Sequence, residues 1–160
     1  MSQAPSGKDS RNMVNIIPAT ENDMPLILEI KQEAISPLWT HGALLGELYK
    51  DDSYFVVAVE STCVIGFAIL RQVGDDGELL QIAVDKNVRR RGTADMLMRA
   101  ILEYVENNAL KSVFLEARKS NTAAIALYKK LGFIELTRVK QKSLEDKNSN
   151  IAIYMKKSGL

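Results

Sequence analysis

A short apolar run, a basic loop with one glycine and a helix start form the stretch with the clearest chemistry. The apolar run is residues 82–84, the loop is residues 85–92, and an amphipathic helix is expected from Thr93. The first turn of a helix has unpaired N–H groups that attract phosphate, and Gly92 lets a ligand approach the backbone closely. Three consecutive arginines at 89–91 add positive charge. This stretch predicts a phosphate-binding loop, and a solvated basic loop that caps a helix is the alternative.

The rest of the chain must supply a sheet and helices that hold this loop. Runs rich in β-branched and aromatic residues predict strands, and apolar residues at helical spacing predict helices. The order is therefore β-α-α-β-β-β-α-β-α-β-β, which favours an α/β fold, a mixed sheet with helices on both faces. The expected strands are residues 14–17, 54–59, 64–72, 78–84, 112–117, 133–139 and 150–155, with turns at 60–62 and 74–77; the expected helices are 20–35, 39–49, 93–108 and 122–131.

Composition excludes several classes of protein. The chain has 160 residues, a net charge of +1, one histidine and one cysteine. That length fits one domain, and the polar residues 1–12 predict a flexible tail. The small net charge gives no general attraction to nucleic acid or acidic membranes. Cys63 alone excludes an internal disulfide and a cysteine-based zinc site, and His41 alone excludes a multi-histidine metal site, so no metal is expected.

No apolar run approaches the length that crosses a bilayer, which is about 20 residues. The N-terminal residues also lack the apolar core of a secretory signal. We therefore expect a cytoplasmic protein with no membrane partner.

Two motifs resemble those of a known family. Arg89-x-x-Gly92-x-Ala94 after a strand resembles the pyrophosphate-binding motif of the GNAT superfamily of acyl-CoA-dependent N-acyltransferases. Residues 115–133, LEARKSNTAAIALYKKLGF, resemble the signature of the RimI-type enzymes, which acetylate the N-terminal alanine of a small-subunit ribosomal protein. The resemblance covers about residues 14–155. It implies a single GNAT-type domain at 13–157 with a mixed, mainly antiparallel sheet.

The resemblance implies a direct attack of an amine on the thioester of acetyl-CoA. Glu116 matches the family's general base, and Tyr128 matches the general acid that protonates the departing thiolate. Partial burial of the carboxylate would suit it to accept a proton near pH 7. Each residue has a structural alternative: Glu116 as a strand carboxylate paired with Arg118 or a lysine, and Tyr128 as a core aromatic on the helix face of residues 124–131.

The resemblance also implies a set of cofactor contacts. The main chain of one strand pairs with the pantetheine amides, and an N–H there can stabilise the oxyanion of the intermediate. The loop and the helix start surround the pyrophosphate. An asparagine hydrogen-bonds the CoA, and a helix N-cap is its equally open and compatible alternative. The residues concerned are Ile82, Ala83, Val84, Arg90, Arg91, Gly92, Thr93, Ala94, Asp95 and Asn121.

The acceptor site departs from the RimI-type pattern in places. The branch usually has tyrosines after the sixth strand, whereas residues 138–144 contain no aromatic residue, and Gln81 stands where asparagine is common. Trp39 and His41 lie in the region that lines the acceptor cleft in this family. Cys63, in or beside a strand, is expected to be a small buried apolar residue.

Taken together, these patterns predict an acetyl-CoA-dependent N-acetyltransferase. The expected acceptor is a peptide or protein N-terminus, with a small-subunit ribosomal protein as the acceptor of the branch and no direct contact with nucleic acid. Two alternatives stay open: a GNAT enzyme for a small-molecule amine, and a non-catalytic acyl-CoA-binding or interaction module. The presence of both Glu116 and Tyr128 argues against the module, which needs neither.

Overall fold

The computed structural model describes residues 13–31, 40–89, 91–136 and 152–159. The predicted tail at residues 1–12 lies outside this part of the chain, and so do Trp39, Arg90 and residues 138–144.

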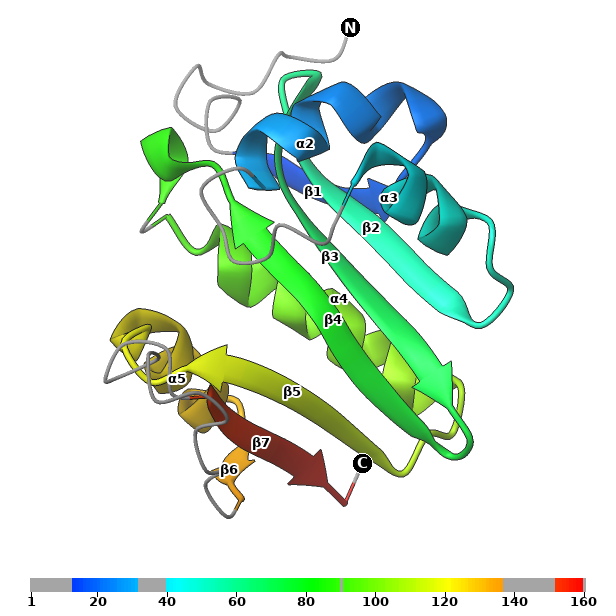
Figure 1. Cartoon of the computed structure of the whole chain (residues 1–160). Coiled ribbons are helices and arrows are strands. Elements are labelled where there is room, and N and C mark those ends of the chain that lie inside the picture. Colours follow the sequence, from blue (N-terminus) through cyan, green and yellow to red (C-terminus); the bar gives the residue numbers. More distant parts are fainter. Residues whose placement is uncertain (1–12, 32–39, 90, 137–151, 160) are drawn as a thin grey trace, which may run out of the picture. The chain divides into compact units, whose positions relative to one another are not determined.

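Seven strands form one hydrogen-bonded sheet in the order β1-β2-β3-β4-β5-β7-β6 (Figure 1). The β1–β2, β5–β7 and β6–β7 pairs are antiparallel, and the β4–β5 pair is parallel. The predicted α/β fold with a mixed, mainly antiparallel sheet is confirmed. The strands are β1 (Val14–Pro18), β2 (Ser53–Glu60), β3 (Cys63–Val73), β4 (Asp76–Val84), β5 (Ser112–Arg118), β6 (Ile134–Glu135) and β7 (Ala152–Ser158).

Six helical segments accompany the sheet. The four α-helices begin and end within a few residues of the predicted positions wherever the structure describes their ends. The 3-10 turn η2 inside the basic loop was not predicted. The segments are η1 (Glu21–Asp23), α2 (Met24–Lys31), α3 (His41–Leu48), η2 (Lys86–Val88), α4 (Thr93–Asn107) and α5 (Thr122–Lys130).

The chain divides into two compact units. The first contains Met1–Leu70 and Gln81–Leu102, and the second contains Arg71–Leu80 and Glu103–Leu160. The basic loop belongs to the first unit, and the signature at residues 115–133 belongs to the second.

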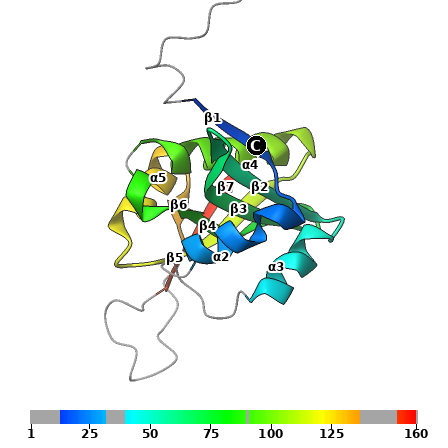
Figure 2. The same cartoon turned by 90° about the horizontal axis from the view of Figure 1, so that it is seen from above.

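In the first unit, α2 and α3 lie on one side of β2 and β3, and α4 lies on the other side (Figure 1, Figure 2). The strands bury side chains on both faces, as a strand between two helical layers must. Gly66 on β3 permits the approach of α4, because an added Cβ would lie 3.2 Å from Leu97 Cδ1 and 3.0 Å from the carbonyl oxygen of Ala83. The largest fully buried side chains here are Phe67, Met24, Ile27, Leu44, Ile69, Leu70, Leu97, Met98, Ile101, Val56 and Val57.

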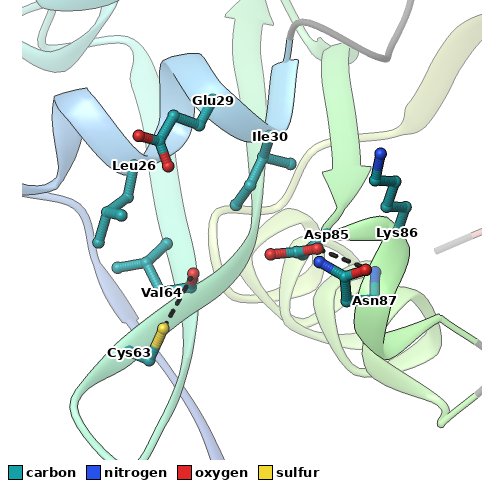
Figure 3. Close-up of a pocket in the computed structure, with 8 residues that line it drawn as sticks. All are labelled: Leu26, Glu29, Ile30, Cys63, Val64, Asp85, Lys86 and Asn87. Carbon is teal, nitrogen blue, oxygen red and sulfur yellow. Dashed lines mark hydrogen bonds between the residues drawn. The ribbon is translucent and has the colours of Figure 1, made fainter.

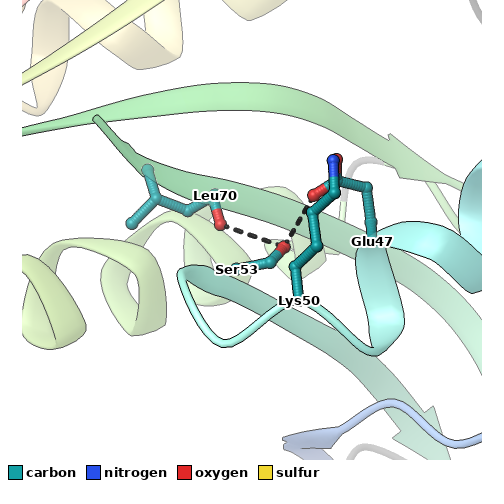
Figure 4. A network of polar contacts seen from close by, with 4 residues as sticks. All are labelled: Glu47, Lys50, Ser53 and Leu70. Atoms are coloured by element: carbon teal, nitrogen blue, oxygen red, sulfur yellow. Dashed lines mark hydrogen bonds and ion pairs between the residues drawn. The ribbon is translucent and has the colours of Figure 1, made fainter.

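A buried carboxylate ties α3 to the start of β2 (Figure 4). Glu47 is only 3% exposed, and its Oε2 accepts a hydrogen bond from Ser53 Oγ at 2.9 Å. Its other oxygen lies 3.1 Å from Lys50 Nζ. A buried charge is tolerated where it is paired and hydrogen-bonded, as this one is.

The first edge of the sheet is β1, whose five residues pair with β2 in an antiparallel register that ends at Pro18 and Val56. A capping box follows directly. The backbone N–H of Thr20 donates to Asp23 Oδ2 at 2.8 Å, which confirms the predicted helix start.

The β2–β3 hairpin turns through Ser61 and Thr62, which both have positive φ, 49° and 67°. Two such residues are typical of the two-residue hairpin turn, so the turn predicted at 60–62 is confirmed. The turn predicted at 74–77 is shorter than expected, because β4 already begins at Asp76.

The second unit contains the β5–β7–β6 part of the sheet and α5. Gly132, with φ 99°, ends α5 as predicted. Strand β7 extends to Ser158, whereas the prediction ended it at residue 155. The added residues continue the register with β5, in which Ser112 lies opposite Ser158. Of the strand predicted at 133–139, the structure describes only Ile134–Glu135 as β6, and the stretch beyond residue 136 lies outside the described residues.

Candidate active site

The basic loop of the first unit runs from the end of β4 to the start of α4. The N–H of Asp85 donates to the carbonyl of Ile65 at 2.8 Å, and the Asp85 carboxylate accepts from the N–H of Asn87 at 2.9 Å. Gly92, with φ 82°, makes the final turn into α4, and an added Cβ there would meet nothing within 4 Å. A residue in this left-handed region favours glycine, so the predicted need for Gly92 has a conformational basis.

The two described arginines of the loop already have protein partners. Arg89 Nε donates to the carbonyl of Val84 at 3.2 Å. Arg91 Nη2 lies 2.7 Å from both carboxylate oxygens of Glu60, the last residue of β2. Both arginines are also exposed, so these contacts do not distinguish a phosphate-binding loop from a solvated basic loop.

The first turn of α4 follows Gly92. Thr93 is 2% exposed, and its Oγ1 has no hydrogen-bond partner within the described part of the chain. Ala94 and Asp95 are half-buried. Asp95 Oδ2 accepts from Arg99 Nε at 2.7 Å, so a cation one turn along balances the acidic side chain at a helix end that attracts anions.

The last residues of β4 are Ile82, Ala83 and Val84. Ala83 and Val84 are buried, and Ile82 is half-buried. The register between β4 and β5 covers Asp76–Leu79, so these three residues lie beyond it. Strand β4 also neighbours β3 in the sheet, so only main-chain groups on the β5 side of these residues can pair with ligand amides.

The second unit holds the predicted general base. Glu116 is exposed on β5, so the partial burial that would suit it as a base near pH 7 is absent. Tyr154 of β7 lies opposite Glu116 in the antiparallel register. Burial, the charge of Glu116, a side-chain hydrogen bond to Glu116 and the charge of Glu78 together raise the pKa of Tyr154. The sequence reasoning missed both Tyr154 and Glu78.

Tyr128, the predicted general acid, is 5% exposed, and its ring centroid lies 5.9 Å from that of Phe133. Burial raises the pKa of Tyr128 to about 12. This environment fits the alternative of a core aromatic, and it also keeps the phenol protonated at neutral pH. Asn121 Oδ1 accepts from the N–H of Ala124 at 3.2 Å, which confirms the alternative of a helix N-cap for that residue.

A pocket in the first unit lies between α2, the start of β3 and η2 (Figure 3). Cys63 was expected to be buried, and it is exposed because it is the first residue after the hairpin turn. Its Sγ lies 3.8 Å from the carbonyl oxygen of Val64. The eight lining residues are Leu26, Glu29, Ile30, Cys63, Val64, Asp85, Lys86 and Asn87.

Among the described residues, no three side chains of the metal-binding types gather at one place. His41 is exposed at the first position of α3. No helix in the described stretches is both long enough and apolar enough to span a membrane.

Comparison with known proteins agrees with this architecture. The sequence profile described as the Acetyltransferase (GNAT) family matches residues 21–133, and the chain belongs to this family. It is 34% identical over 127 residues to the ribosomal protein bS18-alanine N-acetyltransferase of Salmonella typhimurium. The aligned region covers 79% of this chain and 83% of that protein.

Solved structures show the same fold. The crystal structure of the ribosomal-protein-S18-alanine N-acetyltransferase from Escherichia coli superposes with a TM-score of 0.81 at 28% identity, over 91% of this chain and 94% of that one. The crystal structure of Ard1 from Thermoplasma volcanium superposes with a TM-score of 0.80 at 26% identity, over 92% of this chain and 98% of that one. The predicted class, an N-acetyltransferase of the GNAT family with RimI-type relatives, is confirmed.

Proposed function

We propose that this enzyme transfers the acetyl group of acetyl-CoA to the α-amine of a protein N-terminus, with the terminal alanine of a ribosomal protein as the acceptor type. The observation that carries the proposal is the 34% identity to a ribosomal protein bS18-alanine N-acetyltransferase over most of both chains. Such an acceptor is a cytoplasmic one, in keeping with the location expected from the sequence.

Acetyl-CoA is held by residues of β4, of the loop and of α4. The main chain of the three β4 residues pairs with the pantetheine amides, and one of their N–H groups stabilises the oxyanion. The N–H groups after Gly92 bind the pyrophosphate. Asn121 hydrogen-bonds the CoA through its amide nitrogen, since its Oδ1 accepts from Ala124. The proposed contacts are Ile82, Ala83, Val84, Arg90, Arg91, Gly92, Thr93, Ala94, Asp95 and Asn121.

The acetyl transfer needs one proton removed and one proton supplied. The neutral amine forms a C–N bond to the thioester carbonyl, and the C–S bond then breaks. Glu116 accepts the proton that the amine loses, and Tyr128 donates a proton to the departing thiolate. Support for Glu116 comes from its exposure on β5, which leaves the carboxylate accessible. The phenol of Tyr128 is protonated at neutral pH, as a proton donor must be, although burial raises its pKa to about 12, away from the value near the operating pH that best suits a general acid.

The proton chemistry favours an α-amine over a lysine. An α-amine has a pKa of about 7.7–8.0, whereas that of a lysine is about 10.4. The difference of roughly 2.5 units corresponds to about 3.4 kcal/mol, which a lysine acetylase must supply from its site. An exposed carboxylate such as Glu116 suits the amine that is already partly neutral.

The test is mass spectrometry of a peptide that carries both an N-terminal alanine and an internal lysine, incubated with the enzyme and acetyl-CoA. We expect the acetyl group on the α-amine of the alanine. Acetylation mainly of the lysine would contradict the proposal. So would an unmodified peptide in a reaction that consumes a small amine such as a polyamine, and that outcome would identify a small-molecule acetyltransferase instead.

A further inference from the structure

The ion pair between Glu60 and Arg91 connects two parts of the first unit that are 31 residues apart in the sequence. A single nitrogen, Arg91 Nη2, contacts both oxygens of the Glu60 carboxylate, each at 2.7 Å. The Arg91 side chain is 42% exposed, while that of Glu60 is 15% exposed. The carboxylate is therefore the more sheltered partner, and the guanidinium reaches towards it.

Glu60 is a firm anchor for such a contact. It is the last residue of β2, and it lies opposite Val14 in the β1–β2 register. Its backbone is therefore fixed by the sheet. Arg91 directly precedes Gly92, whose φ of 82° turns the chain into α4. The ion pair consequently fixes the residue from which the helix N-terminus departs.

Arg89 supplies a second anchor for the same loop. Its Nε donates to the carbonyl of Val84, the last residue of β4, at 3.2 Å. The loop between β4 and α4 is thus attached by one guanidinium to β4 and by another to β2. Both groups are directed at protein oxygen atoms.

We infer that Arg91 is a positioning residue, whose ion pair with Glu60 holds the N-terminus of α4 in the geometry that binds the CoA pyrophosphate. The inference rests on the proposed function and refines it: Arg91 contributes its backbone to the loop that surrounds the pyrophosphate, and its side chain acts through Glu60 and is not a ligand of the phosphate oxygens. An N-terminus fixed in advance binds more tightly because less freedom is lost on binding.

The two roles open to Arg91 predict opposite effects of Glu60→Gln. If Arg91 ligates phosphate, Glu60 competes for its guanidinium, and the substitution tightens CoA binding. The loss of a negative charge near a polyanion acts in the same direction. If Glu60 positions Arg91, the substitution loosens the loop, and binding weakens by about three- to fivefold, as expected for an ion pair worth up to about 1 kcal/mol.

The experiment is titration calorimetry with CoA on the full chain, for the wild type, Glu60→Gln, Arg91→Gln and the double variant. We expect both single variants to weaken binding, Arg91→Gln by more because it also removes a positive charge near the polyanion, and the double variant to be no weaker than Arg91→Gln, because all three remove one interaction. In acetylation assays, the KM for acetyl-CoA should rise while kcat stays the same. Circular dichroism checks that each variant is folded.

Asp75→Asn is the matched control. It also replaces one carboxylate of an ion pair by an amide, in this case the exposed Asp75–Lys111 pair at 3.4 Å. We expect its CoA affinity to equal that of the wild type. Tighter binding by Glu60→Gln, or a double variant that loses the sum of both single effects, would overturn the inference while leaving the proposed function intact. A wild-type chain that does not bind CoA would overturn both.

Discussion

Glu116 and Tyr154 lie directly opposite each other on the antiparallel strands β5 and β7. The carboxylate raises the pKa of the phenol, after the effect of burial, by its charge and by a side-chain hydrogen bond. The phenol is thus a donor to the carboxylate that we propose as the general base. One carboxylate oxygen is oriented by this contact, and other lone pairs remain available to the amine.

We predict that Tyr154→Phe lowers kcat/KM for the peptide by about tenfold, which is the low end for losing a hydrogen bond to a charged group. Glu78, Arg118 and Lys156 are the other charged side chains on the neighbouring strand positions, and this variant leaves them unchanged. The measurement is kcat/KM from steady-state kinetics with the peptide.

Tyr49→Phe is the control for this prediction. Glu21 raises the pKa of Tyr49 chiefly through a side-chain hydrogen bond, so the substitution removes the same kind of contact outside the proposed site. Its kcat/KM for the peptide should match that of the wild type. A Tyr154→Phe variant with the same kcat/KM as Tyr49→Phe would contradict a positioning role for Tyr154.

Glu116→Gln and Tyr128→Phe should each lower turnover by about 10²–10⁴-fold, the usual contribution of a general base or acid. Both should largely spare the affinity for acetyl-CoA. Steady-state kinetics at pH 6–9 and calorimetry measure the two quantities. Near wild-type turnover of Tyr128→Phe would show that Tyr128 is a core aromatic residue and not the general acid. Its ring contact with Phe133 is consistent with that alternative.

The raised pKa of Tyr128, about 12, makes stability depend on alkaline pH. The folded state favours the neutral phenol, so its contribution is complete below the unfolded value of about 10 and is lost as the pH rises to 12. We expect the free energy of unfolding to fall by roughly 2–3 kcal/mol over this window. Urea unfolding at pH 9 and pH 12 measures it. In Tyr128→Phe the fall should be smaller by that amount, and an equal fall in both proteins would refute the assignment.

Gly92→Asp should abolish CoA binding, because it puts a negative charge beside the phosphate and an L-residue at φ 82°. Gly74→Asp is a close control: its φ is 62°, and an added Cβ there also meets nothing within 4 Å. Both variants carry the same kind of backbone strain, and only the first lies in the loop. Calorimetry should show wild-type affinity for Gly74→Asp. Unchanged CoA affinity in Gly92→Asp would eliminate the loop as the phosphate site.

Gly66→Ala should destabilise the protein by about 1–3 kcal/mol, the usual range for overpacking. Its Cβ would lie 3.0 Å from the carbonyl oxygen of Ala83, which is backbone and does not move aside easily. Gly46→Ala in the exposed part of α3 meets nothing within 4 Å and should stabilise by roughly 0.5–1 kcal/mol. The midpoints of urea denaturation compare the two. Equal midpoints would show that β3 and α4 can separate at no cost.

The sequence predicts most of the elements because their signals are local. The amphipathic pattern of α4, the Thr20–Asp23 capping box and the Gly132 stop each depend on a few neighbouring residues. The pairing of β7 is different, because its register with β5 is set by contacts about 40 residues apart in the chain. For this reason the prediction ended β7 three residues early and left Tyr154 unnoticed.

In the candidate site, too, the sequence predicts the local motifs but not the contacts between residues that are far apart in the chain. The loop at 85–92 and the signature around Glu116 were found because motif spacing is local. The partner of Arg91 was not, because Glu60 lies on β2 and no pattern in the loop identifies it. The exposure of Cys63 was missed because a hydropathy pattern does not locate the first residue after a turn.

The first edge strand of the sheet, β1, ends at Pro18, which has no N–H to donate. An unpaired edge strand can pair with a strand of another molecule, and that pairing requires an N–H donor at every second position. Pro18 interrupts the row of N–H donors next to the exposed Ile17, whose apolar side chain would otherwise favour association at this edge. Pro18 therefore removes one of the donors that strand pairing between two molecules would need, a constraint on the sequence that is unrelated to acetyl transfer.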